Sequence, residues 1–148
     1  MSYQATPQMV LDLSAITVLN INIVGRITQN IKVDGRECWT LFDTGARNTY
    51  VTSSVARILK TSEMSHAYRT ALGGDVKETK TAAILEGEIE GHPITTHALV
   101  LENIGEDDGG KNIEILFGAL AMQQWGIRPV PDEERLDLTH YPKEFVEF

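Results

Sequence analysis

The alternation of apolar and polar residues predicts short strands joined by tight turns. Two apolar-patterned runs, 31–33 and 36–42, flank the dipeptide Asp34-Gly35. A two-residue Asp-Gly connection between such runs is typical of a β-hairpin, because both turn positions need a positive φ. The second run is β-prone and ends abruptly in Asp43-Thr44-Gly45. The pattern therefore predicts a carboxylate in the first turn after a buried strand.

The remaining pattern predicts further strands and one short helix. Residues 1–10 are polar and expected to be loose, whereas closely spaced apolar residues in Leu11–Ile23 favour strands. A brief strand is expected at Thr49–Val51. Residues 52–54 then offer Thr and Ser as N-cap side chains for a helix over Val55–Lys60.

Two more hairpins are predicted downstream. Tyr68–Leu72 and Val76–Lys80 flank Gly73-Gly74-Asp75, which indicates a solvent-exposed hairpin with a glycine tip. Residues 81–102 form the next hairpin around Gly91-His92-Pro93, and their alternating apolar positions favour a half-buried sheet. The acidic stretch 103–112 is expected to be a solvated loop, because it lacks the ligand pattern of a calcium-binding loop.

Composition and charge limit the class of protein. A chain of 148 residues suits one domain, and 42% hydrophobic residues is enough for one packed core. No run approaches a transmembrane span, so no membrane partner is expected. The net charge of −8 repels phosphate backbones, which argues against nucleic acid as a partner.

The few cysteine and histidine residues narrow the location and the cofactors. A single cysteine excludes an internal disulfide framework, and Cys38 is expected to be a small buried hydrophobe. Residues 1–13 lack the features of a secretory signal. Together these features favour a cytoplasmic location. The four histidines show no zinc-binding motif, so no metal is predicted.

The tripeptide Asp43-Thr44-Gly45 supplies the chemistry of an acid catalyst. Burial raises the pKa of a carboxyl group and a second carboxylate nearby raises one pKa further, which suits general acid and base catalysis. Thr44 adds a hydroxyl, and Gly45 leaves room for backbone or substrate to approach. An ordinary turn would also explain the tripeptide.

Residues 30–51 and 113–118 resemble the retropepsin family, the single-domain aspartic proteases that include the retroviral enzymes. In that family a hairpin leads into the catalytic Asp-Thr/Ser-Gly, and an alanine such as Ala46 is the usual next residue. The second landmark is an apolar strand ending in glycine, here Gly118, which crosses the catalytic loop closely. A short helix follows, here expected at Ala119–Trp125. The implied fold is mostly β: a single-domain closed β-barrel of the acid protease type, with a short C-terminal helix and a flap hairpin.

The resemblance also implies boundaries and a mechanism. It implies an N-terminal extension at 1–20, a protease domain at 21–128, and a C-terminal segment at 129–148 as a candidate dimer contact. Because Asp-Thr-Gly occurs once, a mechanism with two carboxylates needs two chains, each contributing Asp43 across a twofold axis. The implied activity is that of a homodimeric aspartic endopeptidase, which hydrolyses a peptide or protein substrate with a water activated between the two Asp43 carboxyls. No cofactor is implied.

Site residues carry over by their match to the family motifs. The glycine-tipped hairpin is expected to close over the substrate as a flap, although an ordinary surface hairpin would have the same sequence features. Thr44 is expected to tie the two active-site loops together across the axis. The implied catalytic residues are Asp43, Thr44 and Gly45, and the implied substrate-binding residues are Ala46, Leu72, Gly73 and Gly74.

Three positions depart from the retroviral pattern. Arg47 stands where those enzymes usually have an acidic residue, Ala119 where they have arginine, and Leu120 where Asp or Asn is common. The ion pair that helps to fasten those dimers is therefore missing in its usual form. Two alternatives follow: a catalytically inactive dimerisation or peptide-binding module on the same fold, or an unrelated β-rich structural protein in which Asp43 caps a turn.

Overall fold

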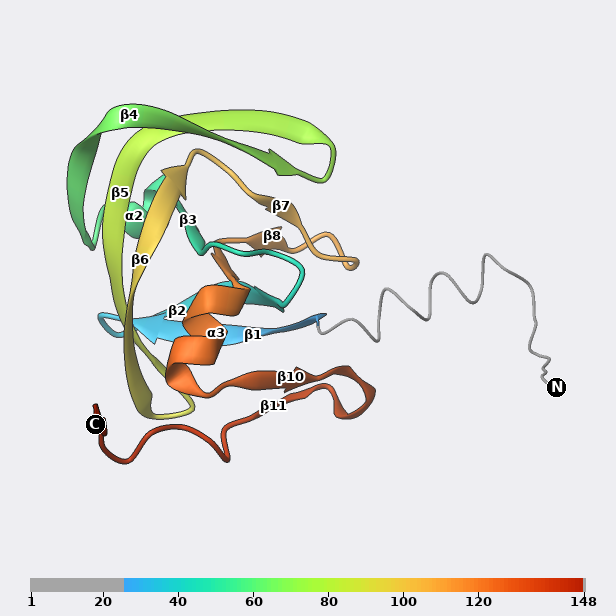
Figure 1. Ribbon diagram of the computed structural model, residues 1–148. Coiled ribbons are helices and arrows are strands. Elements are labelled where there is room, and N and C mark those ends of the chain that lie inside the picture. The colour runs from blue at the N-terminus through green and yellow to red at the C-terminus, as the bar shows by residue number, and fades with distance from the viewer. Residues whose placement is uncertain (1–25, 148) are drawn as a thin grey trace, which may run out of the picture.

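The computed structural model describes residues 26–147, so the loose segment and the strands predicted within residues 1–25 lie outside the described residues. The described chain is mostly β, as predicted, with two short α-helices (Figure 1). The larger strands are β1 (Arg26–Val33), β2 (Arg36–Asp43), β3 (Tyr50–Thr52), β4 (Lys60–Leu72), β5 (Asp75–Ile89), β6 (His92–Leu101) and β9 (Ile115–Phe117). The other elements are α2 (Ser53–Ala56), β7 (Gly105–Glu106), β8 (Asn112–Ile113), α3 (Ala119–Trp125), β10 (Arg128–Val130), a 3-10 turn (Pro131–Glu133) and β11 (Arg135–Asp137).

Seven of these strands form one curved sheet in the order β1-β2-β9-β3-β6-β5-β4. The pairs β2–β9 and β3–β6 are parallel, and the others are antiparallel. A further antiparallel pairing, Lys32 with Glu88, joins β1 to β5. A Cβ at Gly87 would lie 2.8 Å from the Lys32 carbonyl oxygen, so the two strands approach this closely because position 87 has no side chain.

Two predicted hairpin turns are confirmed. Asp34 and Gly35 have φ of 50° and 80°, and Val33 pairs with Arg36 directly across them. Gly73 and Gly74 have φ of 57° and 90° and connect β4 to β5. Both turns need positive φ at two successive positions, which explains why glycine occupies three of the four.

The helix predicted over Val55–Lys60 is wrong in its extent. Helix α2 spans Ser53–Ala56, and Lys60 is already the first residue of β4, where it pairs with Ile84. A longer helix would remove this end of β4 from the sheet. Tertiary pairing therefore overrides the local helix signal.

Two loops also differ in detail from the predictions. The turn between β5 and β6 consists of Glu90 and Gly91, and Pro93 lies within β6 opposite Glu88 instead of in the turn. The stretch 103–112 contains strand β7 and the start of β8, which pair with each other. It is therefore a small hairpin rather than a plain solvated loop.

The core follows the period-two pattern of the strands. Cys38, Thr40 and Phe42 of β2 are fully buried on one face, and the Phe42 ring lies 5.3 Å from that of Phe117. A second, smaller buried cluster lies beside this core and consists of Tyr50, Leu99, Leu101 and Leu116. Within residues 26–147, none of the helices has the length and apolar character needed to cross a membrane.

Candidate active site

Asp43 is the last residue of β2 and begins a tight turn. The Ala46 amide donates to the Asp43 carbonyl oxygen at 3.1 Å, and the Gly45 amide donates to Asp43 Oδ1 at 2.8 Å. A Cβ on Gly45 would lie 3.1 Å from the same Oδ1, so a side chain there would press on the carboxylate. The turn thus fixes Asp43 with its side chain 16% exposed.

Arg26 is the charged partner of this carboxylate. Arg26 and Asp43 face each other at the open end of the β1–β2 hairpin, and Arg26 Nε lies 3.4 Å from Asp43 Oδ2. This contact was not predicted from the sequence. The strand register nevertheless predicts it. Arg26 is the eighth residue before the Asp34-Gly35 turn and Asp43 is the eighth residue after it, so the two lie opposite each other.

The strand end at Gly118 crosses the Asp43 loop at very short distance. A Cβ on Gly118 would lie 2.1 Å from the Asn48 carbonyl oxygen and 2.9 Å from that of Ala46. Helix α3 begins directly after this crossing and spans the residues predicted for it. Its first amides bind the loop, since the Ala119 amide donates to the Ala46 carbonyl oxygen at 2.7 Å. The requirement for glycine at this crossing is confirmed.

A cleft of about 620 Å³ opens in front of Asp43. It brings together residues from the Asp43 loop, the tip of the β4–β5 hairpin and strand β7, and Figure 1 shows this hairpin arching over β7 and β8. Of the seven residues predicted for the site, Asp43, Gly45, Ala46, Leu72 and Gly73 line the cleft. Thr44 and Gly74 lie next to lining residues but outside the lining itself.

The floor of the cleft is apolar and continuous with the smaller buried cluster. Tyr50 and Leu116 belong to this cluster and Leu41 packs against it. All three also line the cleft. Leu41 and Leu116 are neighbours across the parallel β2–β9 pairing. The Tyr50 hydroxyl also lies 2.9 Å from Thr70 Oγ1 and so connects the floor to the β4–β5 hairpin.

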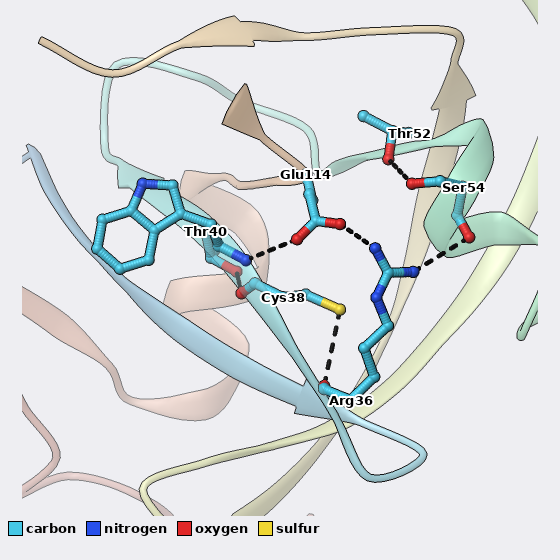
Figure 2. A network of polar contacts seen from close by, with 7 residues as sticks. Arg36, Cys38, Thr40, Thr52, Ser54 and Glu114 are labelled. Atoms are coloured by element: carbon cyan, nitrogen blue, oxygen red, sulfur yellow. Dashed lines mark hydrogen bonds and ion pairs between the residues drawn. The ribbon is translucent and has the colours of Figure 1, made fainter. Parts of the chain in front are cut away.

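A polar network on the neighbouring part of β2 ties three segments of the chain together (Figure 2). Glu114 accepts a hydrogen bond from the Trp39 amide at 3.1 Å and forms an ion pair with Arg36. Arg36 also donates to the Ser54 carbonyl oxygen at 3.3 Å. No local sequence signal predicts this network, because Arg36 and Glu114 are 78 positions apart.

Other titratable groups near the site have structural explanations. Cys38 is fully buried, as predicted, and this burial raises the pKa of its thiol to about 11. Hydrogen bonds from the Lys111 amide and from the Trp39 indole lower the pKa of Asp107. Among residues 26–147, no group of three or more His, Cys, Asp or Glu side chains is placed to hold a metal ion.

Comparisons with known proteins agree with this geometry. A model of the aspartyl protease family matches residues 30–119, which is more than half of the chain. The retroviral protease-like domain of Ddi1 from Leishmania major superposes with a TM-score of 0.55 at 14% identity, covering 79% of this chain and 90% of that chain. This likeness shows a shared fold. No curated protein sequence matches.

Two viral structures are similar over a smaller share of the chain. The EIAV protease in complex with an inhibitor gives a TM-score of 0.45 at 21% identity, covering 68% of this chain and 88% of that chain. A foamy viral protease-reverse transcriptase in complex with an RNA/DNA hybrid gives 0.46 at 11% identity over 69% of this chain. The present chain spans only 12% of the length of that protein.

Proposed function

This chain belongs to the aspartyl protease family and has a retropepsin-like fold, and from that premise we propose that it is an aspartic endopeptidase active as a homodimer. The observation that carries the proposal is the position of Asp43. Its carboxylate is mostly buried, is fixed by the Gly45 amide, and lines a cleft that also contains the tip of a hairpin.

In the proposed reaction, one Asp43 from each protomer meets at the twofold axis. Two carboxyls at such short range do not both ionise readily, so they share one proton and titrate as a pair. The ionised member takes a proton from water, and the resulting hydroxide attacks the scissile carbonyl carbon. The protonated member supports the developing oxyanion, and the leaving amine is protonated in the final step. Thr44 links the two loops across the axis.

The ion pair between Arg26 and Asp43 fits this mechanism as a state of the single protomer. Arg26 balances the charge of the one carboxylate present. Its side chain is 44% exposed, so it is free to move aside when a second Asp43 arrives. When the proton-sharing pair forms, the second Asp43 therefore replaces Arg26 as the partner of the first.

The substrate is proposed to lie extended along the cleft, under the β4–β5 hairpin acting as a flap. The positive φ values of Gly73 and Gly74 support a tip whose backbone can approach a peptide, and Leu72, Gly73 and Ala46 line the space that the peptide would fill. The apolar floor under Asp43 favours apolar side chains next to the scissile bond.

The dimer contacts are proposed to include the C-terminal segment 129–148. Phe145 and Val146 are 62% and 75% exposed, and such apolar side chains gain most from being covered by a second chain. Leu136 of the same segment is already part of the core. A cytoplasmic location completes the proposal, and it is supported by a sequence with a single cysteine.

Cleavage profiling of a denatured proteome from acid to neutral pH tests this function. The wild-type protein is expected to cut peptides, and Asp43→Asn is expected to cut none while remaining folded, because the Asn side-chain oxygen still accepts from the Gly45 amide. Asp34→Asn at the exposed hairpin turn is the matched control and should cut normally. Cutting by Asp43→Asn would refute the assignment, and inactivity of the wild type at every pH would favour a non-catalytic peptide-binding module.

A further inference from the structure

Arg26 and Arg47 both line the cleft, and within residues 26–147 an acidic partner is found for Arg26 alone. Arg26 is paired with Asp43. Arg47 is exposed, lines the same cleft and forms no ion pair with any residue in the range 26–147. Asp75 and Glu106, the other acidic residues of the lining, are likewise outside ion-pair distance of Arg47. Among the described residues, the Arg47 guanidinium in the cleft therefore has no charge partner.

The backbone of Arg47 is held firmly relative to Asp43. The Arg47 carbonyl oxygen accepts from the Leu120 amide at 3.2 Å, and the preceding carbonyl, that of Ala46, accepts from the Ala119 amide. On the other side, Asn48 packs against Gly118 with no space for a Cβ. Arg47 lies four residues after Asp43 and its backbone is fixed. Its guanidinium can therefore reach only a limited stretch of a peptide bound in the cleft.

We propose that Arg47 makes the enzyme selective for substrates with an Asp or Glu side chain at one fixed position near the scissile bond. This inference rests on the proposed function. A guanidinium binds a carboxylate through two parallel hydrogen bonds, which gives both affinity and a defined geometry. The preferred substrate class is thus an extended peptide with apolar residues over the cleft floor and one acidic residue beside Arg47.

The overall charge of the protein sharpens this inference. A net charge of −8 repels acidic peptides at long range. Selectivity for an acidic residue must then come from a local contact and appear at a single substrate position, rather than as a general preference for acidic peptides. Because the contact lies at an exposed residue, it should weaken as added salt screens it.

The test uses a set of decapeptides with an apolar centre, in which Glu, Gln or Lys is placed at each position in turn. For the wild-type protein, the Glu peptide should be cleaved roughly tenfold faster than the Gln peptide at one position, as is usual for a charged hydrogen bond at a partly screened site. Arg47→Glu should invert this preference, so that Lys is favoured over Gln at the same position. Arg57→Glu is the matched control, since Arg57 is also exposed but lines a separate groove.

The outcomes separate the two proposals. Cleavage that depends on Asp43 but shows no Glu preference would overturn the role of Arg47 and leave the protease assignment intact. The same would follow from a Glu preference that survives in Arg47→Glu, or from an inversion that Arg57→Glu reproduces. A loss of the dimer in Arg47→Glu, measured by sedimentation, would make Arg47 an interface residue instead. No cleavage of any peptide by the wild type would remove the proposed function and this inference with it.

Discussion

Arg26 and Asp43 form a cross-strand ion pair at the open end of the β1–β2 hairpin, with 3.4 Å between Arg26 Nε and Asp43 Oδ2. The pair joins the first described residue of the sheet to the candidate catalytic carboxylate. We expect the pair to matter for the position of the Asp43 side chain more than for the stability of the fold. Arg26 is 44% exposed, and exposed ion pairs contribute little to the free energy of folding.

Arg26→Gln is therefore expected to lower the free energy of unfolding by about 0.2–1 kcal/mol. Urea denaturation followed by tryptophan fluorescence measures this change. Arg128→Gln is the control, because Arg128 forms an ion pair of similar length, 3.5 Å, with Asp137, and its side chain is more exposed than that of Arg26. A loss several times larger for Arg26→Gln than for the control would mean that the ion pair holds the hairpin together.

Gly118→Ala is expected to destabilise the protein by about 3 kcal/mol or more, or to prevent folding. The new methyl group would overlap the Asn48 carbonyl oxygen, and both the loop and the start of α3 are held by backbone hydrogen bonds that resist a shift. Chemical denaturation or the yield of folded protein measures the effect. Gly109→Ala is the control, since its methyl group would make only an ordinary 3.5 Å contact with Asp107. Equal stability of the two variants would contradict the close crossing.

The elements that the sequence predicted correctly have strong local signals. Asp34-Gly35 and Gly73-Gly74 carry the positive φ values that two-residue hairpin turns require. The extent of α3 was instead expected from the resemblance to the retropepsin family, in which a short helix follows the second landmark. Five of the seven predicted site residues meet in one cleft, because the motif and the glycine tip come from the two segments that face each other there.

The features that were missed depend on long-range pairing. Glu114 binds Arg36 and the Trp39 amide across about half of the length of the chain, and no spacing rule points to it. In the sequence alone, Gly87 looks like an ordinary strand glycine. Its close approach to Lys32 becomes evident only from the pairing of β1 with β5. Arg26 is the intermediate case, because its partner follows from the strand register once the hairpin turn is known.

Cys38 is expected to be unreactive in the folded protein and to make the free energy of unfolding fall at alkaline pH. Burial raises the pKa of its thiol from 9.0 to about 11. Because the folded pKa lies above the unfolded one, the stability that the thiol contributes is complete below about pH 9 and is lost as the pH rises toward 11. Unfolding free energies of the wild type and Cys38→Ala, compared across this range, should show a larger alkaline loss in the wild type. Rapid labelling of native Cys38 by a thiol reagent at neutral pH would contradict its burial.

In the proposed enzyme, two chains each supply one Asp43 to a single active site, and subunit mixing tests this most directly. Wild-type protein and Asp43→Asn are mixed in equal amounts, allowed to exchange subunits, and assayed on one peptide against unmixed wild type at the same total concentration. After random pairing, about one quarter of the dimers contain two intact Asp43 side chains. If activity needs both, the mixture should therefore have about one quarter of the activity of unmixed wild type. Activity of about one half would mean that each chain works alone, and would contradict the shared site.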